Sequence, residues 1–267
     1  MSAEQHVQTE LVDGIATITL NRPEALNALS PRMTDALIEH TASAECDDRV
    51  RCLVLRGNGR AFMAGGDVKG MREALTTDRE GHLARTEMRV LRAHQFVAQL
   101  RRMRKPVLAA VQGPVAGIGL GISLAADFVV ARDDAYFLMA YRHIGLSADG
   151  GATYFLPRLV GERRALEYAL LGDRIPAAEA LACGLVNRVV PAAQFEAVTA
   201  DIARRLADGP TRALGAVKQL IRTSFESTWD QHSHREAESI AAAAATQDHL
   251  EGVTAFVEKR RPVFAGR

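Results

Sequence analysis

The sequence lacks most of the features that mark secreted, nucleic-acid-binding or metal-binding proteins. Its three cysteines form no CxxC pair and leave an odd count, so we expect no disulfide framework and no metal site. The formal net charge is +1, and no long block of like charge suggests a nucleic-acid partner. The densest basic run, residues 101–105, is predicted to be a solvated helix end, with phosphate contact as the alternative. The polar N-terminus does not resemble a signal peptide, and we expect a cytoplasmic protein.

Motifs for common cofactors and nucleophiles are also missing. The glycine-rich segment at 117–122 departs from GxGxxG because its last position is Ile122, so dinucleotide binding is not expected. The sequence has no Walker loop and no GxSxG elbow for a serine nucleophile, and its eight histidines form no ligand cluster. We therefore predict no permanently bound cofactor.

One uncharged stretch, residues 106–126, is long enough to span a bilayer. Gln112, Pro114 and four glycines interrupt it, which favours a buried strand, a glycine turn and a buried helix instead. We therefore expect no membrane partner.

Short apolar runs that alternate with helical patterns predict an α/β fold. Asp13-Gly14 between two alternating runs indicates a hairpin, and Ser30-Pro31 indicates the start of a helix. Everything beyond Pro191 reads as helical, and we divide the chain into a core, residues 1–200, and a helical region, residues 201–267. Further strands are predicted at 52–55, 107–111, 128–131 and 186–190, and helices at about 80–103, 161–171 and 177–182.

Two glycine loops are the strongest candidates for a functional site. Ala64-Gly65-Gly66-Asp67 and the segment from Gly113 to Gly121 each follow a predicted strand, and the second segment opens a helix. Glycines let a backbone approach a ligand closely, and a helix N-terminus adds N–H donors that have no partner in the helix. Close packing of a strand on a helix is the structural alternative.

Five ordered segments resemble the blocks of the enoyl-CoA hydratase/isomerase family, also called the crotonase family. They are NRPEALNAL (21–29), AFMAGGDVKGM (61–71), KPVLAAVQGPVAGIGLGISLAADFVVA (105–131), IGLSADGGATYFLPRLVG (144–161) and EGVTAFVEKRRPVF (251–264). The resemblance implies an α/β fold built as a spiral of strand–strand–helix turns with a C-terminal helical region. It also implies a homotrimer or a dimer of trimers, with residues 201–267 at the subunit interface.

The resemblance further implies that the protein binds an acyl-CoA thioester, so that coenzyme A arrives as part of the substrate. The backbone N–H groups of Gly66 and Ile118 would hold the thioester oxygen and stabilise an enolate, although Ile118 stands where the family usually has glycine. Lys259 or Arg260 would reach the phosphates, from the same subunit or from a neighbouring one, with plain surface charge as the alternative. The residues that would line the substrate site are Ala25, Leu26, Ala64, Gly66, Asp67, Val68, Lys69, Gly117 and Tyr141.

The acids of the site distinguish between possible reactions. The well-known hydratases of the family use two glutamates, whose positions correspond here to Gly121 and Tyr141, and neither residue offers a carboxylate. The nearest remaining acid is Asp149, at a position where several isomerases of the family carry an acid. The resemblance therefore favours an isomerase in which Asp149 moves one proton, to shift a double bond or to rearrange an epoxide.

Alternatives stay open at several of these residues. Asp149 before two glycines also suits a turn, and Tyr141 could donate a hydrogen bond to substrate or fill the acyl pocket. Asp67 is expected to cap a helix rather than act as a base, and Asp127 is assigned no chemistry. Two competing functions are a hydratase that pairs Asp149 with a partner such as Tyr141, and a non-catalytic acyl-CoA-binding protein.

Overall fold

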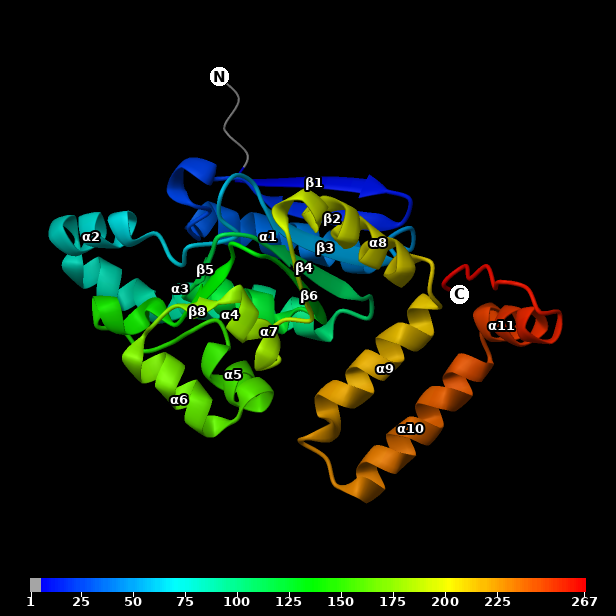
Figure 1. Ribbon diagram of the computed structural model, residues 1–267. Coiled ribbons are helices and arrows are strands. Elements are labelled where there is room, and N and C mark those ends of the chain that lie inside the picture. Colours follow the sequence, from blue (N-terminus) through cyan, green and yellow to red (C-terminus); the bar gives the residue numbers. More distant parts are fainter. Residues whose placement is uncertain (1–5) are drawn as a thin grey trace.

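A six-stranded sheet and a smaller three-stranded sheet form the body of the molecule (Figure 1). The structure is a computed structural model that describes residues 6–267. The strands of the large sheet, in spatial order, are β1 (Val7–Val12), β2 (Ile15–Leu20), β3 (Cys52–Gly57), β4 (Val107–Val111), β6 (Phe128–Arg132) and β9 (Arg188–Val190). Those of the small sheet are β5 (Pro114–Ala116), β7 (Tyr136–Leu138) and β8 (Ile175–Pro176).

The large sheet begins with the predicted hairpin and continues as parallel strands. β1 and β2 pair antiparallel across Asp13-Gly14, and every later neighbour in this sheet pairs in parallel. Leu53 and Leu55 of β3 join the main hydrophobic core, while Val54 between them joins a second cluster. Successive residues of a strand point to opposite faces, so both faces of this sheet are buried, as is usual for parallel strands.

The helices follow pairs of strands, which produces the strand–strand–helix repeat. Their bounds are α1 (Pro31–Cys46), α2 (Val68–Thr77), α3 (Arg79–Arg102), α4 (Ile118–Ala125), α5 (Ala152–Val160), α6 (Glu162–Leu171), α7 (Ala177–Ala182), α8 (Phe195–Ala207), α9 (Thr211–Ser224), α10 (Trp229–Ala244) and α11 (Gln247–Val257). β4, β5 and α4 form one repeat, and β6, β7 and α5 form the next. The prediction of a spiral α/β fold with a C-terminal helical region is confirmed.

Local signals in the sequence account for several element boundaries. α1 begins at Pro31, and the Ser30 hydroxyl caps it by accepting a hydrogen bond from the N–H of Met33 at 3.2 Å. The uncharged stretch at 106–126 forms β4, β5 and α4, as its glycines and proline predict. Across residues 6–267, no helix combines the length and the apolar character needed to cross a membrane.

The basic run at 101–105 is more buried than the sequence predicts. Lys105 is only 8% exposed, and its Nζ donates to the carbonyl oxygens of Ala44 and Asp47, each at 2.7 Å, where α1 ends. The last carbonyls of a helix have no intrahelical donor, and the ammonium group satisfies two of them. Arg101 is half-buried. The prediction of a solvated helix end is therefore wrong for Lys105, whereas Arg102 and Arg104 are exposed, as predicted.

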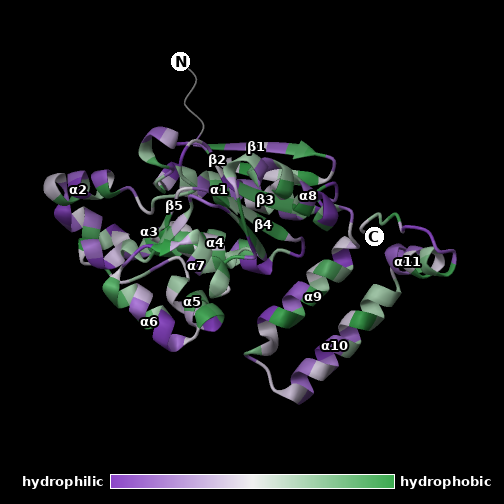
Figure 2. Cartoon of the chain, viewed as in Figure 1, coloured by the Kyte–Doolittle hydropathy of each residue, from purple (hydrophilic) through white to green (hydrophobic). Residues whose placement is uncertain are grey.

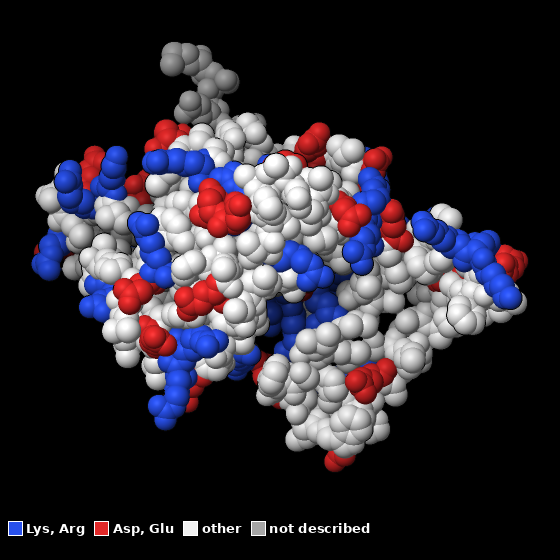
Figure 3. Space-filling view, in the orientation of Figure 1, with Lys and Arg blue, Asp and Glu red and all other residues white. Residues whose placement is uncertain are grey.

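The last helices divide into one that packs on the sheet and three that extend from the body. Phe195 and Ile202 of α8 pack with Val54 in the second core cluster. α9, α10 and α11 reach away from the body, and apolar residues on them are open to solvent (Figures 1 and 2). Figure 3 shows Lys and Arg side chains gathered in the hollow between the body and these helices. The predicted boundary between residues 200 and 201 falls inside α8, and the division into two parts stays a prediction.

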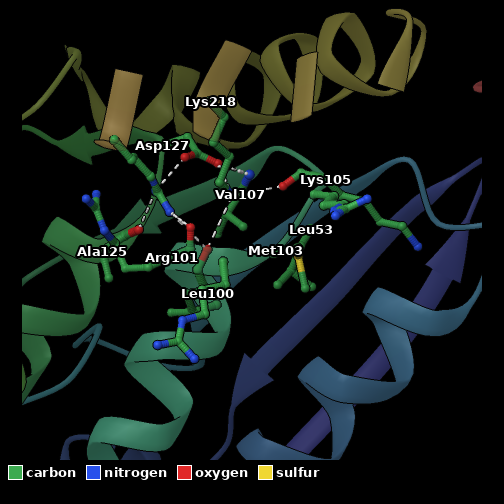
Figure 4. A network of polar contacts seen from close by, with 12 residues as sticks. Leu53, Leu100, Arg101, Met103, Lys105, Val107, Ala125, Asp127 and Lys218 are labelled. Atoms are coloured by element: carbon green, nitrogen blue, oxygen red, sulfur yellow. Dashed lines mark hydrogen bonds and ion pairs between the residues drawn. The ribbon is translucent and has the colours of Figure 1, made fainter. Parts of the chain in front are cut away.

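A buried ion cluster around Asp127 fastens α9 to the large sheet (Figure 4). Lys218 Nζ lies 2.7 Å from one carboxylate oxygen of Asp127, and Arg222 donates to the other at 2.5 Å. The N–H of Val107 donates to the same carboxylate at 2.8 Å. Burial lowers the pKa of Lys218 to about 8 and that of Arg222 to about 10, and the charge of Asp127 opposes both shifts. Asp127 thus joins the helical region to the sheet.

Candidate active site

The two glycine loops lie side by side in the structure. Met63 pairs with Val115 in a parallel bridge, and the N–H of Ala116 donates to the carbonyl oxygen of Met63 at 2.9 Å. A Cβ added to Gly65 would lie 3.4 Å from the carbonyl oxygen of Ala116, and one added to Gly117 would lie 3.4 Å from the Cα of Gly65. The backbones of the loops are therefore in van der Waals contact, and the φ angles of Gly65 (105°) and Gly117 (53°) explain why glycine occupies these two positions.

Gly66 and Ile118 each present a backbone N–H on one of these adjoining loops. Ile118 is the first residue of α4, so no carbonyl of the helix accepts from its N–H. Gly117 precedes it with φ 53° and ψ −126°, a backbone conformation that glycine adopts readily. Among residues 6–267, neither N–H donates in a backbone hydrogen bond of the loops. Both groups therefore lack a backbone hydrogen-bond acceptor among the described residues.

The turn that carries Asp149 packs on the start of α4. A Cβ added to Gly150 would lie 2.8 Å from Cγ1 of Ile118, and one added to Gly121 would lie 2.3 Å from the carbonyl oxygen of Gly150. Gly150 and Gly151 have φ of 64° and 77°, in the left-handed region that favours glycine. Asp149 thus lies close to Ile118, and position 121 has no room for a side chain unless the turn moves.

The carboxylate of Asp149 is held by Tyr141. The Tyr141 hydroxyl donates to Oδ1 of Asp149 at 2.6 Å, and both side chains are partly buried. Burial, and after it the charge of Asp149, raises the pKa of Tyr141 above its ordinary value, so the hydroxyl remains a donor at neutral pH. The sequence left two roles open for Tyr141, contact with substrate or filling of the pocket. The structure adds a third role, because the Tyr141 hydroxyl contacts the carboxylate of Asp149, the candidate base.

His94 contacts the same turn, although no motif in the sequence selects it. The N–H of Gly150 donates to Nε2 of His94 at 3.0 Å. His94 lies in the middle of α3, and the two residues are 56 positions apart in the chain. No motif surrounds His94, so only the packing of α3 beside α4 and the turn could reveal the contact.

The other predicted substrate-binding residues gather around the first glycine loop. Ala25 and Leu26 lie at the end of a short 3-10 helix, and the N–H of Ala64 donates to the carbonyl oxygen of Leu26 at 3.0 Å. Val68 and Lys69 begin α2 and are exposed to solvent. The structure therefore brings these five residues to the same loop.

Asp67 follows Gly66 directly, but its carboxylate is occupied. It accepts a hydrogen bond from the N–H of Gly70 at 3.1 Å, which caps α2, and another from the Arg22 guanidinium at 3.1 Å. The Gly70 hydrogen bond, followed by Arg22, lowers the pKa of Asp67. These contacts give Asp67 the helix-capping role that the sequence favours.

Lys259 and Arg260 lie far from the glycine loops within one chain. They follow α11, which Figure 1 shows at the opposite end of the molecule from α2. Arg260 also pairs with Glu251 and Glu258 at 2.6 Å each. A contact between these cations and a ligand on the glycine loops would therefore need a neighbouring subunit.

Comparison with known proteins identifies the family. The model of the enoyl-CoA hydratase/isomerase family matches residues 10–267, and the chain belongs to this family. The 1,2-epoxyphenylacetyl-CoA isomerase of Escherichia coli (strain K12) is 37% identical over 98% of this chain and 99% of its own length. A protein of Rhodobacter capsulatus named a probable enoyl-CoA hydratase is 39% identical over 98% of each chain. The crystal structure of an enoyl-CoA hydratase from Polaromonas sp. JS666 superposes with a TM-score of 0.90 at 32% identity, covering 97% of this chain and 99% of that one.

The protein is thus an enzyme of the enoyl-CoA hydratase/isomerase family. Relatives named as an isomerase and as a hydratase match it at nearly equal identity. The choice between the two reactions therefore depends on the side chains of this chain.

Proposed function

We propose that the protein is an acyl-CoA isomerase in which Asp149 moves one proton. The observation that carries this proposal is that, among residues 6–267, Asp149 is the acid on the turn against Ile118, whereas the carboxylate of Asp67 is occupied by Gly70 and Arg22. Asp149 lies on the turn packed against Ile118, whereas position 121 has no room for a side chain and position 141 holds a tyrosine. One carboxylate is enough to shuttle a proton, but hydration needs a base for water and an acid for carbon. The relative named 1,2-epoxyphenylacetyl-CoA isomerase supports this choice.

A 3-enoyl thioester would react by two proton transfers. Asp149 takes a proton from C2, and the electron pair of the broken C–H bond moves toward the thioester oxygen, which becomes an enolate oxyanion. The N–H groups of Gly66 and Ile118 donate to that oxyanion, and each such donor typically contributes about 10²–10³ in rate. The Asp149 carboxyl group then returns the proton to C4, the double bond moves from C3–C4 to C2–C3, and the carbonyl reforms. A thioester that carries an epoxide is the alternative substrate.

Turnover of the purified protein on 3-enoyl-CoA, 2-enoyl-CoA and epoxyphenylacetyl-CoA tests the proposal. We expect a 3-enoyl or an epoxide thioester to be converted into an isomer of the same mass. Addition of water to the 2-enoyl thioester as the fastest reaction would overturn the assignment. Binding of all three thioesters without any conversion would favour the non-catalytic acyl-CoA-binding protein.

We further propose that the coenzyme A portion of the substrate lies along the first glycine loop, beside Ala25, Leu26, Ala64, Val68 and Lys69. Gly117 and Tyr141 would border the acyl group on the other side. The support is the contact between Leu26 and Ala64 and the exposed start of α2. Calorimetry with acetoacetyl-CoA, which resembles the enolate, should show binding, and no heat at millimolar ligand would contradict the site.

A hydratase that uses Asp149 together with Tyr141 is the second candidate. The contact of 2.6 Å between the Tyr141 hydroxyl and Asp149 favours it, because a phenol can supply a proton to carbon while the carboxylate activates water. We prefer the isomerase because one carboxylate, Asp149, is enough for it, whereas hydration would also need proton transfer by Tyr141. Hydration of crotonyl-CoA distinguishes the two.

We also propose that the protein works in the cytoplasm as a homotrimer or a dimer of trimers, held partly by residues 201–267. Large apolar side chains on α9, α10 and α11 and near them are exposed, and a stable monomer rarely leaves so many together. They include Val217, Ile221, Phe225, Trp229, Ile240, Leu250, Phe256 and Val257. Light scattering at micromolar concentration should give a multiple of three chains, and a monomer would contradict the proposal.

A further inference from the structure

We propose that His94 is a positioning residue that holds the turn carrying Asp149. This inference rests on the proposed function, because it concerns how Asp149, the candidate base, is oriented. The Nε2 atom of His94 accepts the N–H of Gly150 at 3.0 Å, and an atom that accepts from an N–H carries no proton of its own. The imidazole is therefore neutral in this arrangement, with its proton on Nδ1.

The turn needs such a support because its own backbone is adaptable. Gly150 and Gly151 are two successive glycines with positive φ, and glycine has more conformational freedom than any other residue. Within the turn, the N–H of Ala152 donates to the carbonyl oxygen of Asp149 at 3.2 Å, which closes the loop locally. His94 supplies a hydrogen-bond acceptor for the N–H of Gly150 from a different element, α3.

The support comes from a rigid part of the molecule. Ala93, Phe96 and Val97 are the neighbours of His94 on α3, and all three are buried in the main core. The imidazole therefore stands on a helix that cannot shift without disturbing the core. The carbonyl oxygen of Gly150, which belongs to the next peptide group, lies against Gly121 of α4. α3 and α4 thus contact the backbone of Gly150 at two groups, its N–H and its carbonyl oxygen.

Two side chains then share the task of orienting Asp149. Tyr141 holds the carboxylate through its hydroxyl, and His94 holds the peptide that follows Asp149. Without this anchor the backbone of residues 149 and 150 could shift and carry the Asp149 side chain with it. A misplacement of about 1 Å in a reacting group can cost roughly 10² in rate, so a residue that never touches substrate can affect turnover.

The test compares His94→Leu with His94→Gln. Leucine fills similar space but accepts no hydrogen bond, whereas the Oε1 of glutamine can occupy the place of Nε2 and accept from Gly150. We expect His94→Leu to lower kcat about tenfold, with KM within about twofold, which is the change that one ordinary hydrogen bond contributes. Glutamine should restore kcat to within about threefold of the wild type. Gln95→Leu, one position along the same helix and exposed, is the matched control and should change nothing.

Hydrogen exchange at the Gly150 amide supplies a readout that does not depend on the reaction. Loss of its acceptor should speed exchange about tenfold in His94→Leu and much less in His94→Gln. If leucine fails to fold, His94→Asn replaces it, because its amide is one methylene too short to reach Gly150. Equal kcat losses for leucine and glutamine, or unchanged Gly150 exchange in the variant without an acceptor, would overturn the inference. If the wild type isomerises no thioester, the proposed function fails, and the exchange measurement still decides whether His94 holds the turn.

Discussion

Asp127 and Asp149 flank the same glycine-rich helix, α4, but their surroundings differ completely. Asp127 accepts from Lys218, Arg222 and the N–H of Val107, so cations and a backbone donor occupy its carboxylate. Asp149 is held by one neutral donor, the Tyr141 hydroxyl, and no cation pairs with it among the described residues. Its turn lies against Ile118, whose N–H we propose as a donor to the thioester oxygen.

The partners of the two carboxylates, rather than their burial, distinguish them. Both acids are partly buried. A carboxylate between two cations cannot leave them without exposing buried charge, which suits a permanent contact between α9 and the sheet. A carboxylate held by a single hydroxyl can exchange a proton with a substrate and keep its place. Substitution of Asp149 should therefore lower turnover, whereas substitution of Asp127 should lower the free energy of unfolding.

The largest expected effect is on turnover in Asp149→Asn. Asparagine can still accept from the Tyr141 hydroxyl and suits the turn, but it cannot take up a proton at neutral pH. Turnover should fall by about 10²–10⁴, while affinity for acetoacetyl-CoA changes little and the free energy of unfolding by less than about 1 kcal/mol. Kinetics, calorimetry and thermal melting on one preparation check all three. A large loss of stability with the loss of turnover would instead support the purely structural reading of the turn.

Asp127→Asn should show the opposite pattern. Removing the carboxylate leaves Lys218 and Arg222, whose side chains are 7% and 10% exposed, without a counter-charge. The free energy of unfolding should drop by about 3 kcal/mol, with turnover of the folded protein within about twofold of the wild type. Asp35→Asn, which breaks the exposed pair with Arg92, is the control and should cost less than about 1 kcal/mol. Denaturant unfolding gives both values, and equal losses in the two variants would contradict the account of the cluster.

Tyr141→Phe is expected to have the smallest effect. It removes the hydrogen bond to Asp149 but leaves the ring in place, so turnover should fall about tenfold with little change in binding. Tyr136→Phe on the neighbouring β7 is the matched control and should leave turnover unchanged. A loss of 10² or more would make Tyr141 a group that transfers protons, as the hydratase hypothesis requires.

Much of the fold could be predicted because its signals are local. The Asp13-Gly14 turn, the Ser30 cap and the glycine-interrupted stretch at 106–126 each act within a few residues, and the structure follows them. The burial of Lys105 could not be predicted in this way. Its partners are carbonyl oxygens at the end of α1, about sixty positions earlier, and nothing near residue 105 indicates them.

The candidate site was predicted only as far as family resemblance reaches. Asp149 and the two glycine loops stand in recognisable blocks, and the structure brings them together. His94 stands in no such block. The contact between Tyr141 and Asp149 depends on how the short helix Ala140–Ile144 is oriented relative to the turn that carries Asp149. The reason for Gly121 is also visible only in the fold, since the carbonyl oxygen of Gly150 fills the space for its side chain.

The rate of crotonyl-CoA hydration by the wild-type enzyme tests the central claim most directly. In the proposed site Asp149 can move one proton, but neither position 121 nor position 141 supplies a second carboxylate to activate water. We predict a turnover number for hydration far below the roughly 10 per second of a typical enzyme, and slower than isomerisation of the preferred thioester. Hydration at about 10 per second or faster would contradict the assignment and make Asp149 and Tyr141 a hydratase pair.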